Sequence, residues 1–222
     1  MLDRLGLGYE TLAGENPRLV VCSISGYGQR SPYRERSGHD VNYLALSGLT
    51  ALTGAAGGPP VQSAGQFADI GAALIAAFAV LAALRERDAS GRGQHVDASL
   101  FDASLIWLGL LVAKQLCDGE PVRRGVTERA ACYRLYACAD GHVALAALEP
   151  GFWASFCRGV EREDLIACQW DGEGSETQRA LERLFAARTR AQWQAFASEH
   201  DCCLEPVLEL DEALASPLAR ER

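Results

Sequence analysis

The feature that most limits how this chain can fold is an uncharged, mainly apolar run at residues 70–84 (IGAALIAAFAVLAAL). Asp69 precedes the run, and Arg85, Glu86 and Arg87 follow it. Because the run is shorter than the ~20 apolar residues that cross a bilayer, we predict a buried helix and no membrane anchor. Asp69 would lie at the start of this helix, where a carboxylate can accept hydrogen bonds from free N–H groups.

A strand and a glycine-rich loop precede this helix. Residues 19–25 (LVVCSIS) follow a turn-forming Asn-Pro pair and end at Gly26, which predicts a buried strand. Residues 39–53 carry apolar side chains near helical spacing and predict another helix. The glycines and prolines of 54–60 (GAAGGPP) interrupt both regular structures, so this segment is predicted to be a loop.

The chain continues with a second strand and a second apolar helix, predicted at 94–100 (QHVDASL) and 101–116. This order of strands and helices indicates an α/β fold. The next segment is polar, charged and weakly periodic, as at a domain boundary. We therefore predict a large α/β domain portion at 1–117, a linker at 118–130 and a small domain at 131–222.

The small domain is predicted to be α+β. Two strand-like runs at 133–138 and 142–148 are joined by Ala139-Asp140-Gly141, and a short connection that ends in Asp-Gly is typical of a β-hairpin. Three amphipathic stretches and a last short apolar run follow, at 150–159, 174–187, 190–199 and 204–208.

Composition argues against several classes of protein. With 21 basic and 29 acidic residues and a formal net charge of −8, the chain lacks the basic excess by which nucleic-acid binders displace counterions from phosphates. Residues 1–10 contain no apolar run of the length that a secretory signal needs, so we expect a cytoplasmic location. The eight cysteines show no CxxC pair and no metal-ligand spacing, so we expect reduced thiols and no metal.

Six stretches of the chain agree in order and spacing with a known pattern. They are NPRLVVCSISGYGQRSPY at 16–33, SGHDVNYLALSGL at 37–49, GGPP at 57–60, FADIGAALIAAFAVLAALRER at 67–87, GRGQHVDASLFDA at 91–103 and YACADGHVALAALEPGFW at 136–153. Together they resemble CoA-transferase family III, the CaiB/BaiF superfamily, which includes the α-methylacyl-CoA racemases. The match extends over nearly the whole chain.

The resemblance implies a large domain with a Rossmann-like sheet, a smaller α+β domain, and two protomers threaded through one another as an interlocked homodimer. It also implies an acyl-CoA and a carboxylic acid as partners, with the coenzyme A thioester as substrate and no permanently bound cofactor. The family places a further CoA-binding segment ahead of residue 1 and a return to the large domain after the small one. We expect both to be missing, which leaves an inactive remnant or a subunit fragment as an alternative.

In the transferases of this family, the residue that matches Asp69 is the nucleophile. Its carboxylate attacks the acyl-CoA thioester to give a mixed anhydride, and the released CoA thiolate returns to form an enzyme-bound thioester. A carboxylate suits this role because the anhydride stays activated for the second transfer. The resemblance therefore implies an enzyme that transfers CoA from an acyl-CoA to a carboxylic acid through an aspartyl intermediate.

In the racemase branch, the aspartate instead shares acid/base chemistry with the histidine of a Gly-His-Asp-x-Asn-Tyr motif, which residues 38–43 match in full. Inverting the α-carbon requires one group to remove a proton and another to return it from the opposite face. His39 and Asp69 would supply these groups, Glu149 would orient or polarise His39, and backbone N–H groups at the helix start would stabilise the enolate. FADIGAAL lacks the glycine-rich run typical of the racemases, so both chemistries remain open.

Further residues are implied to line the CoA-thioester site: Ser23, Gly26, Gly28, Gly38, Asp40 and Tyr43. The three catalytic candidates also have structural interpretations. Asp69 can be a simple helix cap, His39 can form only local hydrogen bonds, and Glu149 before a proline can end a strand and start a helix. We expect Asp97 and His95 to have structural roles on their strand.

Overall fold

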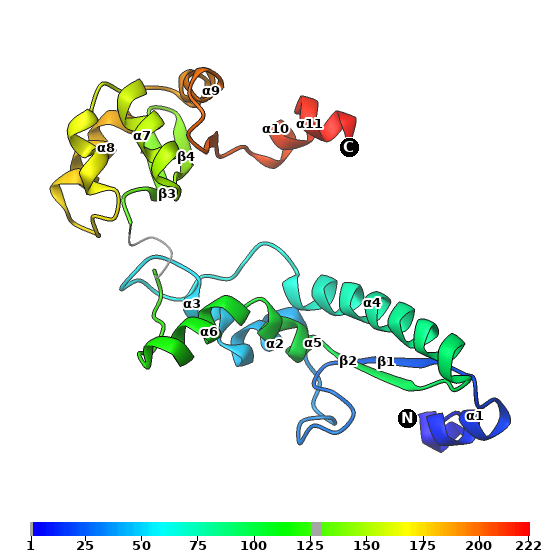
Figure 1. Ribbon diagram of the computed structural model, residues 1–222. Coiled ribbons are helices and arrows are strands. Elements are labelled where there is room, and N and C mark those ends of the chain that lie inside the picture. Colours follow the sequence, from blue (N-terminus) through cyan, green and yellow to red (C-terminus); the bar gives the residue numbers. More distant parts are fainter. Residues whose placement is uncertain (1, 126–129) are drawn as a thin grey trace. The chain divides into compact units, whose positions relative to one another are not determined.

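The computed structural model describes residues 2–125 and 130–222, so 126–129 of the predicted linker lie outside the described residues. The chain divides into two compact units, Met1–Arg124 and Gly125–Arg222. Figure 1 shows the helices and strands of each unit. The expected α/β architecture, with a parallel sheet and helices followed by a smaller unit, is confirmed.

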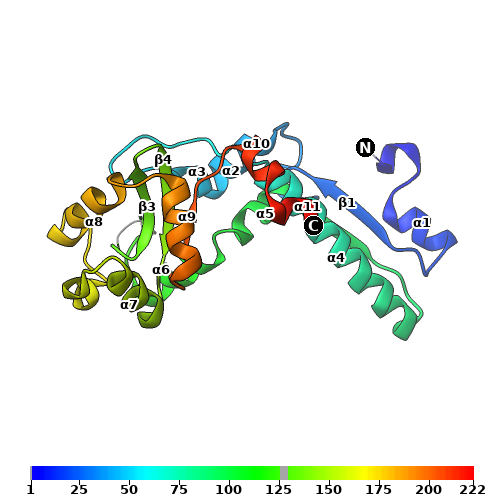
Figure 2. The ribbon, with the colours of Figure 1, turned by 90° about the horizontal axis from the view of Figure 1, so that it is seen from above.

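The sheet of the first unit is a parallel pair of strands, β1 (Val21–Ser25) and β2 (His95–Ser99). Their register pairs Val21 with His95 and Ser25 with Ser99. The connection between them contains α2 (Asp40–Ser47), α3 (Leu49–Leu52) and α4 (Phe67–Ser90), while η1 (Leu2–Leu5) and α1 (Tyr9–Glu15) precede β1. In both views α4 runs alongside the two strands (Figures 1 and 2).

The prediction that α4 is buried is wrong for one of its faces. The inner face carries small residues that pack closely, namely Ala68, Gly71, Ala72, Ala76 and Ala83. The outer face carries large apolar side chains that are 57% to 75% exposed, namely Ile70, Leu74, Phe78 and Leu81. The prediction was wrong because a residue pattern that is apolar on all sides of a helix normally indicates burial.

The helix is also longer than predicted, at 24 residues. Among the described residues, α4 alone is long and apolar enough to cross a membrane by length and composition. A second such span arises only if α5 (Leu100–Ile106) and α6 (Gly109–Asp118) are taken as one, although a bend of 59° separates them. Core helices of many proteins meet the same criterion, so the finding does not assign a membrane role.

Two segments that were each predicted as one helix are broken. Gly48 has a φ of 93°, a left-handed conformation that ends α2 and starts α3. The predicted helix at 101–116 is likewise the bent pair of α5 and α6. In this pair the break lies at Trp107 and Leu108, where the N–H of Leu108 donates to the carbonyl of Leu105 at 3.0 Å. This three-residue step tightens the chain and turns the second helix away.

The first part of the predicted linker packs on the first unit. The N–H of Val122 donates to Oε1 of Gln115 at 3.1 Å. Arg124 donates from Nε to the carbonyl of Ala51 at 2.9 Å and from its guanidinium to the carbonyl of Gly58. These contacts fasten the end of the first unit to α3 and to the loop that follows it.

The second unit contains an antiparallel sheet in the order β3, β4, β5. Its strands are β3 (Tyr133–Cys138), β4 (Gly141–Ala146) and β5 (Leu204–Pro206), and its helices are α7 (Pro150–Gly159), η2 (Glu163–Cys168), α8 (Glu176–Ala186), α9 (Arg190–Glu199), α10 (Leu210–Ala215) and α11 (Pro217–Glu221). The predicted hairpin and the three predicted amphipathic helices are confirmed.

Aromatic rings form the core of the second unit. Trp153, Phe156, Phe185 and Trp193 are almost fully buried, and Phe156 and Phe185 stack with their centroids 5.5 Å apart. Both indole N–H groups are satisfied, because Trp153 donates to the carbonyl of Leu165 at 3.0 Å and Trp193 donates to the carbonyl of Phe185 at 3.1 Å. Buried indoles with satisfied N–H groups make this core well specified.

An ion pair fastens the C-terminal helices to this unit. The guanidinium of Arg190, at the start of α9, donates to both carboxylate oxygens of Glu212 in α10, at 2.7 and 3.0 Å. It also donates to the carbonyl of Val207 at 3.0 Å. The backbone N–H of Arg190 in turn donates to Oδ1 of Asp140 in the hairpin turn at 2.7 Å. The turn, α9 and α10 are therefore joined at one residue.

Candidate functional site

Asp69 lies exposed in the first turn of α4. The residue before the helix, Gln66, provides no side-chain cap. Instead, Oδ1 of Asp40 accepts hydrogen bonds from the N–H of Ala68 at 2.7 Å and from the N–H of Asp69 at 3.2 Å. The cap of α4 is thus supplied by another helix, and the carboxylate of Asp69 is not needed for that purpose.

These two hydrogen bonds correct one prediction. Backbone N–H groups at the start of this helix were expected to stabilise an enolate oxygen. The N–H groups of Ala68 and Asp69 already donate to Asp40, so this expectation is wrong for them. A sequence pattern cannot reveal a cap that comes from 28 residues away.

His39 immediately precedes α2 and is exposed. Its backbone N–H donates to Oδ1 of Asn42 at 3.0 Å, and the N–H of Asn42 donates to the His39 carbonyl at 2.8 Å. These reciprocal bonds close the first turn of α2 at His39 and Asn42. Because Asp40 follows His39 directly and contacts the backbone of Asp69, the structure brings both catalytic candidates to one end of α4.

Tyr43 is buried, with 4% of its surface exposed, and its ring occupies the space left by two glycines. A Cβ added at Gly26 would lie 2.5 Å from the Tyr43 hydroxyl oxygen, and one added at Gly38 would lie 3.0 Å from it. Tyr27 meets the ring edge-on with centroids 5.0 Å apart. Burial raises the pKa of Tyr43, and the neighbouring Tyr27 and Asp69 raise it further, so the hydroxyl stays protonated.

Side chains of Ser25 and Asp97 hold the backbone of the glycine-rich loop after β1. Ser23 points to the sheet, where its Oγ lies 2.8 Å from Nε2 of His95. Gly28 has a φ of 86°, and its N–H donates to Oγ of Ser25 at 3.1 Å. The next N–H, that of Gln29, donates to Oδ2 of Asp97 at 2.9 Å. The parallel register places Asp97 opposite Ser23, and no local sequence pattern indicates this contact.

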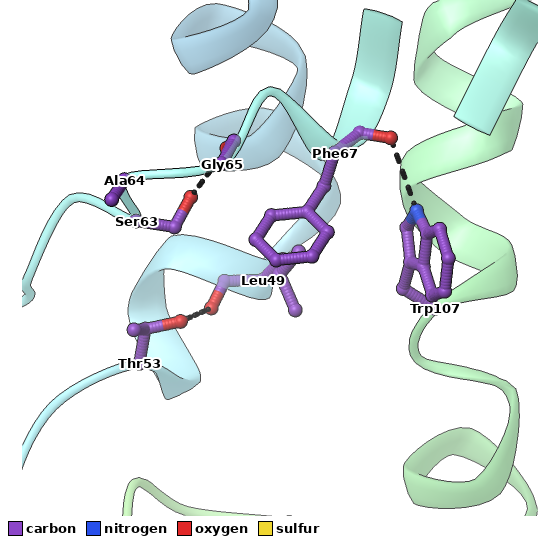
Figure 3. Close-up of a pocket in the computed structure, with 7 residues that line it drawn as sticks. All are labelled: Leu49, Thr53, Ser63, Ala64, Gly65, Phe67 and Trp107. Carbon is purple, nitrogen blue, oxygen red and sulfur yellow. Dashed lines mark hydrogen bonds between the residues drawn. The ribbon is translucent and has the colours of Figure 1, made fainter. Parts of the chain in front are cut away.

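An apolar hollow of about 510 Å³ opens beside the start of α4 (Figure 3). Its lining residues are Leu49, Thr53, Ser63, Ala64, Gly65, Phe67 and Trp107. The polar groups in its wall bond within the chain: Nε1 of Trp107 donates to the carbonyl of Phe67 at 3.1 Å, and the hydroxyls of Thr53 and Ser63 donate to backbone carbonyls. The hollow therefore offers an apolar surface, which suits a hydrocarbon group.

Glu149 belongs to the second unit, where it is exposed and directly precedes Pro150 of α7. Burial raises the pKa of the Cys203 thiol, and the carboxylates of Asp201 and Glu149 add to this rise, so Glu149 lies near Cys203. His39 and Glu149 belong to different units, so the predicted role of Glu149 beside His39 stays a prediction.

The described part of the chain, 2–125 and 130–222, contains no group of three or more His, Cys, Asp or Glu residues that could hold a metal ion. All eight cysteines are free thiols. The site places an exposed aspartate and an exposed histidine at one helix end, beside an apolar hollow.

Comparison with known proteins gives a consistent result. The family model described as CoA-transferase family III matches residues 1–222. The α-methylacyl-CoA racemase of Mus musculus is 34% identical over 229 residues, which cover 100% of this chain and 60% of the relative. The succinyl-CoA:mesaconate CoA-transferase of Haloarcula hispanica is 34% identical over 200 residues, which cover 87% of this chain and 50% of the relative.

A solved structure agrees with these sequences. A CaiB/BaiF family protein from Brucella suis superposes with a TM-score of 0.81 at 27% identity, covering 100% of this chain and 61% of the solved one. The chain thus spans about 60% of the length of several proteins that it matches.

Proposed function

Because the chain belongs to CoA-transferase family III, we propose that it transfers coenzyme A from an acyl-CoA to a carboxylic acid, with Asp69 as the nucleophile. The observation that carries this proposal is the placement of Asp69. Its carboxylate is exposed in the first turn of α4, the capping contacts are made by Asp40, and Phe67, two residues earlier, lines the apolar hollow. An acyl group in the hollow would bring its thioester close to a free carboxylate.

The proposed reaction has four balanced steps. The Asp69 carboxylate attacks the thioester carbonyl carbon, the C–S bond breaks, and an acyl-aspartyl anhydride and the CoA thiolate form. The thiolate attacks the Asp69 carbonyl carbon, which releases the first carboxylic acid and leaves CoA bound to Asp69 as a thioester. The second carboxylate attacks that thioester and expels the thiolate, which then takes the new acyl group and frees Asp69.

This mechanism predicts the fate of one oxygen atom. If the accepting carboxylate carries heavy oxygen, the last step leaves one labelled oxygen on Asp69. Mass spectrometry of the Asp69 peptide after turnover should therefore show the label in the wild-type chain. Asp69→Asn should lose turnover, whereas Asp102→Asn, which changes an exposed aspartate at the start of α5, should keep it. An active chain with no label on Asp69 would contradict the aspartyl intermediate.

A second candidate function is racemase-type proton transfer at the α-carbon by His39 and Asp69. It is favoured by the exposed position of His39, which lies one residue from the aspartate that contacts the Asp69 backbone. Incubation with a 2-methylacyl-CoA in heavy water tests it. Deuterium at the α-carbon that disappears in both His39→Ala and Asp69→Ala would establish this chemistry in place of CoA transfer.

A third possibility is that the chain is an inactive remnant or a subunit fragment. The exposed apolar face of α4 and the share of the relatives that the chain covers favour it. Size-exclusion chromatography tests this, since large exposed apolar surfaces promote aggregation. A clean dimer with turnover would rule it out and would agree with the interlocked homodimer that we propose for the active protein.

A further inference from the structure

The first turn of α4 depends on a residue far away in the sequence. A helix begins with N–H groups that have no partner within the helix. Here two of them, those of Ala68 and Asp69, donate to the same oxygen of Asp40 at 2.7 and 3.2 Å. Ala68 is fully buried, so water is poorly placed to replace its acceptor.

The same turn is fixed from a second direction. Nε1 of Trp107 donates to the carbonyl of Phe67 at 3.1 Å. A Cβ at Gly71 would lie 3.1 Å from that nitrogen and 3.5 Å from Cβ of Ala103, so α5 approaches α4 closely here. Asp69 lies between these contacts on a turn that has little freedom to rotate.

We propose that Asp40 is a positioning residue, which closes the first turn of α4 and thereby sets the direction of the Asp69 carboxylate. This inference rests on the proposed function of Asp69 for its catalytic consequence. It gives Asp40 a role different from the CoA contact that the family resemblance implies. Asp40 acts through the backbone of α4 and touches no reacting atom.

Two variants of Asp40 distinguish a role as the cap of α4 from a role in direct contact with CoA. Asp40→Asn keeps one side-chain oxygen in the place that accepts both N–H groups, but removes the negative charge. Asp40→Ala removes the acceptor and leaves two N–H groups without a partner, one of them buried. A matched control is Asp88→Ala, because Asp88 is an exposed aspartate at the other end of the same helix, roughly 28 Å away by helical rise.

Two measurements on the full chain test whether Asp40 is a positioning residue. Amide hydrogen exchange at Ala68 and Asp69 should be about fivefold or more faster in Asp40→Ala, and close to wild type in Asp40→Asn and Asp88→Ala. With acyl-CoA, kcat of Asp40→Ala should fall about 100-fold while KM changes less than about threefold, because misplacing a nucleophile lowers the rate more than binding. Asp40→Asn should recover most of kcat.

Several results would overturn the inference. They are unchanged exchange in Asp40→Ala, a kcat of Asp40→Ala equal to wild type, or an Asp40→Asn variant as slow as Asp40→Ala. If the wild-type chain turns over no acyl-CoA, the proposed function falls, but hydrogen exchange needs no substrate. Faster exchange in Asp40→Ala would then still support Asp40 as the residue that sets the first turn, and unchanged exchange would still reject it.

Discussion

A methyl group at Gly26 would lie 2.5 Å from the hydroxyl oxygen of Tyr43, closer than real Cβ contacts allow. The ring of Tyr43 is buried against the first turn of α4, so it has little room to retreat. We expect Gly26→Ala to lower the free energy of unfolding by about 1–3 kcal/mol, as overpacking does. Urea unfolding followed by circular dichroism measures this change.

The matched control is Gly14→Ala, because a Cβ at Gly14 in α1 meets nothing within 4 Å. This variant should be as stable as wild type or slightly more so, since alanine favours a helix. Adding Tyr43→Phe to Gly26→Ala should restore part of the lost stability, because it removes the closest atom. Equal stability of Gly26→Ala and wild type would contradict the close packing.

The hollow beside α4 should govern the preference for acyl groups. Trp107→Ala removes an aromatic wall and the hydrogen bond to the Phe67 carbonyl, so we expect KM for a branched long-chain acyl-CoA to rise about tenfold. KM for acetyl-CoA should stay within about twofold, because a short acyl group does not reach the wall. Steady-state kinetics with both substrates measures the difference.

Trp170→Ala provides the comparison, since Trp170 is 64% exposed in the second unit and lines no part of the hollow. It should leave both KM values unchanged. An equal rise in KM for both substrates in Trp107→Ala would show that the hollow stabilises the fold and does not select between acyl groups.

Acid should release the C-terminal helices of the second unit. The guanidinium of Arg190 lowers the pKa of Glu212 from 4.5 to about 2. A carboxyl group whose pKa is lower in the folded state stabilises it above the unfolded pKa and loses this effect as the pH falls through the folded value. The pair should therefore stabilise the attachment of α10 fully above about pH 5, lose most of this effect by about pH 2 and lose the rest below it.

The measurement is hydrogen exchange at residues 207–215, compared between wild type and Glu212→Gln at each pH. The ratio of exchange rates should be large at pH 7, fall steeply toward pH 2 and approach one below it. Asp211→Asn, a change at the neighbouring exposed position of α10, should leave exchange unaffected. A ratio that does not depend on pH would show that this ion pair is not what fastens α10.

The cysteines should differ sharply in reactivity. Burial raises the pKa of Cys157 to about 12 and that of Cys202 to about 11, so both stay protonated at pH 8. Since the thiolate is the reactive form, iodoacetamide should leave them unlabelled in the folded chain and modify the exposed Cys117. Peptide mass spectrometry reads the labels, and urea should make all three equally reactive. Rapid labelling of Cys157 without urea would contradict the buried core.

Much of the fold could be predicted because the signals are local. The hairpin between β3 and β4 follows from Asp140-Gly141, and α7 begins at the proline that the sequence places after Glu149. The break at Gly48 was missed, since only its left-handed φ distinguishes it from a glycine inside a helix. The exposure of the outer face of α4 was also missed, because apolar periodicity does not say what covers a face.

The candidate site residues could be predicted from sequence motifs, but the contacts that hold them could not. Asp69 and His39 were predicted from the motifs that carry the family resemblance; the structure places both residues near the start of α4, and their catalytic roles stay predictions. The cap that Asp40 provides, the support of Gln29 by Asp97 and the wall formed by Trp107 all join residues far apart in the sequence. Such pairings depend on how strands and helices pack, which no local pattern records.

The cap that joins Asp40 to Ala68 also orders events during folding. Residues 28 positions apart must meet before the first turn of α4 is complete, and closing such a loop costs entropy that no local contact returns. Contacts of this kind form late in chains with non-local topology. A partly folded chain can therefore possess the helix without an oriented Asp69, and the carboxylate that we propose as the nucleophile takes its direction only when the surrounding unit has assembled.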